Sequence, residues 1–218
     1  MTTLRSEVRF AHQRLRAHWA SPGATLTGIE RLALVEQVRA ARATPALAPW
    51  ESATEVDATD SEVLEPALVD AVWRIAQSPS SLSEPWFRSV LDAGVSATTY
   101  VEMVSVVAMA TMADRVNEAA GLPVAMLPKP LDGEPTGDFA GAEVSSHWVP
   151  TTNDEMSNVR AALSEIPAEL EMQGLLLDTH YVPGGALGRD LTDSVWSLDR
   201  TQMELVATRT STINECFY

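Results

Sequence analysis

The sequence contains one cysteine and half as many lysines and arginines (15) as aspartates and glutamates (30). A single thiol excludes an internal disulfide, which fits a protein of the reducing cytoplasm. The net charge of −15 disfavours nucleic acid and anionic membrane surfaces as partners, because both would repel the chain. No apolar run approaches the roughly 18 residues of a membrane span. We therefore expect a soluble, cytoplasmic protein.

Alternating strand patterns are nearly absent, whereas signals for helix starts recur along the chain. Five segments place a capping side chain three residues before a glutamate or glutamine, which is the pattern of a capping box. They are Thr27 to Glu30, Ser81 to Glu84, Thr99 to Glu102, Thr152 to Glu155 and Asp199 to Gln202.

Apolar residues follow these starts at helical spacing. Examples are Leu34, Val38 and Ala41 in one segment, and Val101, Val104, Ala108, Thr111 and Met112 in another. We interpret the arginine-rich stretch 1–42 as a solvated helix face rather than a targeting peptide. The pattern predicts an all-α protein with helices near 5–19, 27–43, 64–77, 84–92, 97–120, 154–164, 168–181 and 199–215.

Glycine and proline interrupt the helical periodicity between 121 and 150. This break suggests a first helical half (1–122), a connector (123–150) and the start of a second half (151–218). The segment from Leu26 aligns loosely with that from Leu198 at an offset of 172, as in a duplication whose first copy has lost its chemistry. Chance similarity between helices is the competing explanation.

The candidate site residues, Glu204 and Cys216, lie in the last segment. Twelve residues separate them, so on one straight helix they would point about 120° apart. The apolar neighbours Met203, Leu205 and Val206 would desolvate Glu204 and raise its pKa, which suits proton transfer. Alternatively, the same spacing is compatible with a solvated Glu204 and with a Cys216 thiol near the chain end that has no function.

The stretch "LDRTQMELVATRTSTINECFY" (198–218) resembles the signature of the alkylhydroperoxidase D/carboxymuconolactone decarboxylase-like family, E-L-V-A-x-x-x-S-x-x-N-x-C-x-Y-C. The matching residues are Leu198, Glu204, Leu205, Val206, Ala207, Ser211, Asn214, Cys216 and Tyr218. The resemblance is weaker over 68–123 and 158–170.

This resemblance implies a helical peroxidase (AhpD-like bundle) that reduces hydroperoxides with a C-x-x-C dithiol, takes electrons from a dithiol donor, needs no metal or organic cofactor and forms a homo-oligomer. Glu204 would relay protons and Cys216 would be the resolving thiol. The second redox residue and the family histidine lie beyond Tyr218, so the 218-residue chain is expected to be inactive as it stands. We hypothesise that position 219 is a selenocysteine (C-x-x-U); a cysteine there, or a true stop, is the alternative.

Two alternatives stay open. One is a non-redox decarboxylase-like enzyme that uses an acid and a histidine for proton transfer, and the other is a non-catalytic helical interaction module. None of the four histidines matches the family position: His147 is expected in a loop and His180 at a helix end. Met103, Met109 and Met112 are expected in the core.

Overall fold

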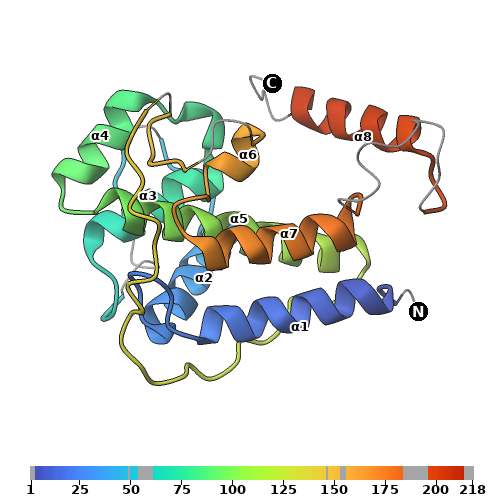
Figure 1. Cartoon of the computed structure of the whole chain (residues 1–218), viewed down its shortest axis with the longest axis horizontal. Helices are drawn as coiled ribbons and strands as arrows, with labels where there is room; N and C mark the ends of the chain where they lie inside the picture. Colours follow the sequence, from blue (N-terminus) through green and yellow to red (C-terminus); the bar gives the residue numbers. More distant parts are fainter. Residues whose placement is uncertain are drawn as a thin grey trace.

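The computed structural model describes residues 3–48, 50–53, 61–145, 147–152, 156–183 and 196–213. Within these ranges the protein is all-helical and contains no strand, as predicted (Figure 1). The elements are α1 (Ser6–Ala20), α2 (Gly28–Ala43), α3 (Pro66–Gln77), the 3₁₀ turn η3 (Pro79–Ser81), α4 (Glu84–Asp92), α5 (Ala97–Ala119), α6 (Asn158–Ala161), α7 (Pro167–His180) and α8 (Arg200–Ile213).

The expected helix 154–164 is wrong in extent, because α6 covers only Asn158–Ala161. Beyond it the chain continues in tight turns, with Leu163 N donating to Arg160 O and Ile166 N to Leu163 O. Residue 166 precedes Pro167, and a residue before proline is disfavoured in the α conformation. A long helix therefore cannot run into α7.

Two of the expected capping boxes are confirmed. Thr27 accepts from the backbone of Glu30, whose side chain accepts in return from Thr27 N. At the start of α8, Asp199 and Gln202 exchange the same reciprocal bonds, at 2.8 and 3.0 Å.

Two other capping assignments are wrong, because the serine directly before each helix is its N-cap. Ser83, not Ser81, accepts from the backbone N–H of Trp86 at the start of α4. Ser96, not Thr99, caps α5, and this leaves Glu102 free for another role. The pattern from Thr152 to Glu155 includes residues outside the described ranges.

One hydrophobic core joins α5 to the helices around it. α2, α3 and α5 pack against one another, and α1 packs against α2 and α7 (Figure 1). Leu34, Val38 and Ala41 are fully buried as predicted, and Met103 and Met109 are also in the core, with Met112 packed against it.

The stripe expected on α5 is only partly right. Val101 is buried, but Ala108 is exposed and Val104 only partly buried. The helix buries Met103, Val106 and Ala110 as well, because neighbours pack on more than one of its sides. A single apolar stripe therefore does not describe it.

The segment 121–145 contains no helix, as its composition predicted, but from Leu131 onward it is hydrogen-bonded to the bundle. Leu131 N donates to Ala20 O, and Thr136 N donates to Gly23 O, each at 2.8 Å. The division into two halves stays a prediction; in the structure α7 packs against α1 and α5, and its residues share their core.

No single helix in the described ranges has both the length and the hydropathy of a membrane span. Only α4 and α5 taken together, across a 116° bend, pass that test by length and composition.

Candidate functional site

Glu204, the predicted proton relay, lies near the start of α8, and two side chains bind its carboxylate. The Tyr181 hydroxyl, directly after α7, donates to Glu204 Oε1. Arg200 Nε lies 2.5 Å from the same oxygen, one helical turn earlier. Trp196 Nε1 donates to the carbonyl of Tyr181 at 2.7 Å, which helps to hold the tyrosine in place.

The predicted rise in the pKa of Glu204 is wrong. The hydrogen bond from Tyr181 lowers this pKa; partial burial acts in the opposite direction, and Arg200 lowers the pKa further. The neighbours Leu205 and Val206 do not shield Glu204 from water, because they are themselves 71% and 60% exposed. At neutral pH the group is therefore a carboxylate, which can accept a proton rather than donate one.

Cys216, the predicted resolving thiol, lies outside the described residues. The described part of α8 ends at Ile213 and contains no buried residue. Leu205, Val206 and Ile213 are all more than half exposed, so α8 presents apolar surface to solvent.

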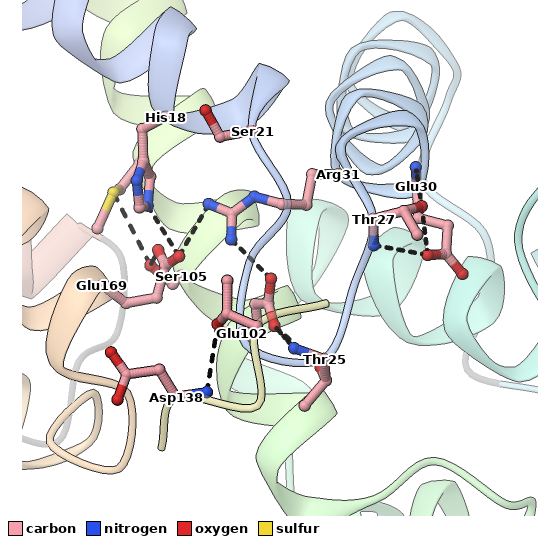
Figure 2. A network of polar contacts seen from close by, with 12 residues as sticks. His18, Ser21, Thr25, Thr27, Glu30, Arg31, Glu102, Ser105, Asp138 and Glu169 are labelled. Carbon is pink, nitrogen blue, oxygen red and sulfur yellow. Dashed lines mark hydrogen bonds and ion pairs between the residues drawn. The ribbon is translucent and has the colours of Figure 1, made fainter. Parts of the chain in front are cut away.

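A second polar cluster lies inside the bundle, and Figure 2 shows it at close range. We call it the buried network; it consists of His18 (α1), Arg31 (α2), Glu102 and Ser105 (α5), and Glu169 (α7). Arg31 lies at its centre, with Nη1 2.6 Å from Glu102 Oε1 and Nη2 2.8 Å from Glu169 Oε1. At most 1% of each of these three side chains is exposed. Charges this deep are stable only when they are paired.

Glu169 is the branching point of the network. Its Oε1 also lies 2.8 Å from His18 Nε2, and its Oε2 accepts from the Ser105 hydroxyl at 2.5 Å. Burial disfavours the charged carboxylate, but the His18 hydrogen bond, the charges of Arg31 and His18 and the Ser105 hydroxyl together lower the pKa of Glu169 to about 2. Glu169 is therefore ionised although it is buried.

Glu102 is held from its other side by the loop between α1 and α2. Its Oε2 accepts from Thr25 N at 2.7 Å and from Thr25 Oγ1 at 2.9 Å. Gly23, in the same loop, approaches so closely that an added Cβ would lie 1.8 Å from Glu102 Oε1 and 2.1 Å from Arg31 Nη1. Only glycine fits this position.

The network contains one guanidinium and two carboxylates, so its net charge is −1 when His18 is neutral and zero when His18 is protonated. The His18 side chain is 16% exposed, whereas Arg31 and both glutamates are sealed from solvent. His18 is therefore the charged or polar member of the network that reaches solvent. The arrangement is an imidazole–carboxylate dyad whose second ring nitrogen is available for chemistry.

The sequence patterns do not predict this network. They indicate a solvated basic face for Arg31 and a helix cap for Glu102, and no role for His18 or Glu169. A usable signal was present: Glu102 stands between Val101 and Met103 in a strongly apolar helix. An isolated charge on a buried face requires a partner.

A further contact joins α1 to α7 through two histidines. His12 Nε2 lies 2.9 Å from His180 Nε2, and the rings stack with their centroids 5.0 Å apart. Burial, with the nearby charges of His180 and Arg16, lowers the pKa of His12 to about 4, although Asp114 opposes the shift.

His180 ends α7 as predicted, and its Nδ1 lies 2.9 Å from Leu176 O. Burial lowers its pKa, which favours the neutral ring over the charged one expected at a helix end. His147 lies in a loop and bonds to Asn158. Across the described ranges no three metal-binding side chains converge.

The fold and these sites define the class of the protein: it is all-helical, with a buried Arg–Glu–His network around the ionised Glu169 and a carboxylate on α8 that Tyr181 and Arg200 bind. No known protein-family model, no curated protein sequence and no solved structure matches the chain significantly.

Proposed function

We propose that the protein reduces hydroperoxides with a thiol–thiol or thiol–selenol pair of which Cys216 is the first member, in the manner of alkylhydroperoxidase D. The proposal is supported by the residues that match this family between Leu198 and Tyr218. The structural observation that carries it is Glu204, which is ionised and held by Tyr181 and Arg200 on the helix that leads to the cysteine.

The proposed reaction has three steps. The second redox residue, three places after Cys216, attacks the terminal peroxide oxygen as its anion. A sulfur–oxygen or selenium–oxygen bond forms, the O–O bond breaks, and the departing alkoxide takes up the proton that this residue lost on ionisation and leaves as the alcohol. The Cys216 thiolate then displaces hydroxide from this sulfenic or selenenic acid to form a disulfide or selenenyl sulfide, and the hydroxide leaves as water with the proton that Cys216 had given to Glu204. A dithiol donor reduces that bond and is itself oxidised.

In this scheme Glu204 takes the thiol proton of Cys216. A carboxylate with a lowered pKa is a weak base for a thiol whose ordinary pKa is about 8.5, so its task is to receive a proton transiently and pass it on. Tyr181, already bonded to Glu204, supplies the next hydroxyl of that path.

The test compares the 218-residue chain with the same chain extended after Tyr218 by five residues that place a cysteine at position 219 and a histidine at position 223, the spacing of the family. We would measure the consumption of cumene hydroperoxide with dihydrolipoamide as the dithiol donor. Turnover is expected in the extended chain and lost on Cys216→Ser; Glu204→Gln should slow it. Glu7→Gln, an exposed carboxylate on α1, is the matched control.

The variants also separate the alternatives. Peroxide turnover that survives Cys216→Ser would overturn the proposal. A decarboxylase-like activity should survive that change and fail with Glu204→Gln, while an interaction module should tolerate both substitutions.

A further inference from the structure

The groove where the buried network meets solvent has the features of a ligand site. A cavity of about 120 Å³ lies between α1 and α7 and is lined by Arg14, His18, Ala168, Glu171, Met172 and Leu175. It adjoins the His18–Glu169 dyad but lies on α1 and α7, away from α8. The inference below does not depend on the proposed peroxidase activity.

A guanidinium and an imidazole face this groove from the same side. Arg14 and His18 are four residues apart on α1, and so lie on one face of the helix. Arg14 is exposed, and among the described residues it has no ion-pair or hydrogen-bond partner. In a chain of net charge −15, a guanidinium without a carboxylate partner is a candidate for binding an external anion.

The dyad makes His18 the second anion contact. Its Nε2 is bonded to the ionised Glu169, and Nδ1 has no hydrogen-bond partner among the described residues. Protonation brings the net charge of the buried network to zero and turns Nδ1 into a donor. An anion in the groove would therefore favour the imidazolium.

The rest of the cavity limits the size and shape of the ligand. Met172 is buried and Leu175 partly so, and with Ala168 they form an apolar wall on α7. The volume corresponds to about four waters at ~30 Å³ each. This space suits a short alkyl chain and one charged group.

We propose that the groove between α1 and α7 binds a small monocarboxylic acid, with its carboxylate between Arg14 and the His18 imidazolium and its alkyl chain on Met172 and Leu175. Glu171, on the opposite wall, is the one lining group whose charge opposes this ligand. Because Arg14 and Glu171 carry opposite charges, removing each of them should change the affinity for a carboxylate in opposite directions.

The probe is sodium propionate at constant ionic strength, followed by the ¹⁵N and ¹³C NMR signals of the histidine rings. We expect the His18 signals to shift saturably in the millimolar range and both of its ring nitrogens to be protonated at saturation. Arg14→Gln should weaken binding about fivefold and Glu171→Gln should tighten it by about threefold, since each change removes one charge contact. Arg9→Gln, an exposed arginine on the same helix, should change nothing.

The proposal is overturned if propionate shifts the His18 signals no more than chloride does, or if His18 Nδ1 stays unprotonated at saturation. It is equally overturned if propylammonium, which has a similar alkyl chain and the opposite charge, binds better than propionate. Arg14 and Glu171 are exposed, so their variants keep the test valid even where a substitution of His18 unfolds the protein.

Discussion

Arg31 and Glu102 form an ion pair from which water is excluded: Nη1 lies 2.6 Å from Oε1, and neither side chain has any exposed surface. They are 71 residues apart in sequence, and their contact joins α2 to α5. The second amino group of Arg31 extends the connection to Glu169 on α7. Three helices therefore converge on one guanidinium, and this arrangement predicts how the fold responds to substitution.

Gly23→Ala should destabilise the protein by about 3–5 kcal/mol, the usual cost of breaking a buried pair. The new methyl group would lie 1.8 Å from Glu102 Oε1, so the pair would have to separate. The free energy of unfolding in urea measures the effect. Gly174→Ala is the control: it lies within α7, meets only the end of Arg160 at 3.4 Å, and should be neutral or stabilising by up to ~1 kcal/mol. A Gly23→Ala protein as stable as the wild type would contradict the packing described here.

Substitutions of Arg31 and of Glu102 should lower the free energy of unfolding by different amounts. Arg31→Met leaves two buried carboxylates without their guanidinium and should cost at least about 3–5 kcal/mol at pH 7. Glu102→Gln should cost less, because Arg31 keeps Glu169 as its counter-ion. Urea unfolding at pH 7 compares them, with Arg88→Met in the exposed pair with Glu84 as a control expected to change stability by roughly 0–1 kcal/mol. If Arg31→Met and Glu102→Gln lose the same unfolding free energy, Glu169 does not act as the remaining counter-ion of Arg31.

Stability should fall on mild acidification because of His12. The folded-state pKa of about 4 lies below the ordinary value of 6.5, so the unfolded chain binds the proton more readily. The stabilisation is therefore present above pH 6.5 and is lost as the pH falls towards 4, by on the order of 3 kcal/mol. Unfolding free energies measured between pH 7 and 4.5 should show this slope in the wild type and a shallower one in His12→Phe. His147→Asn, in a loop, should keep the full slope.

Tyr181→Phe should raise the pKa of Glu204 towards its ordinary value, because the hydroxyl hydrogen bond is the largest cause of the lowering. The ¹³C chemical shift of the Glu204 carboxyl group, followed between pH 2 and 7, measures this directly. Arg200→Gln should act in the same direction, because it removes the charge of the guanidinium. If neither variant moves the titration, the carboxylate is not bound as described.

The exposed apolar residues of α8 predict self-association, in line with the homo-oligomer that the family resemblance implies. Leu205 and Val206 are 71% and 60% exposed. Their replacement by serine should lower the weight-average mass in sedimentation equilibrium, because burial of apolar area favours association. Met126→Ser is the control, because this residue is 89% exposed but lies outside α8. A monomeric wild-type protein would contradict this prediction.

The elements of the fold were predictable because helix signals are local. Thr27 with Glu30 and Asp199 with Gln202 form the expected caps, and glycine and proline mark the non-helical stretch after α5. The errors occurred where two local signals compete, as at Ser96 and Thr99, and the sequence contains no measure of which one the packed helix uses.

The candidate site at Glu204 was likewise predictable only in its local features. The position of Glu204 on a helix followed from periodicity, but its ionised state did not, since Tyr181 comes from a different element and binds it through the tertiary fold.

By itself, the sequence determined that the chain is helical and where most helices begin and end, because caps and apolar periodicity act over a few residues. Only the tertiary structure decided that His18 meets Glu169 across 151 residues and that Arg31 meets Glu102 across 71. A buried charge is stable only beside its counter-charge, and the packing of α1, α2, α5 and α7 determines which charges become neighbours.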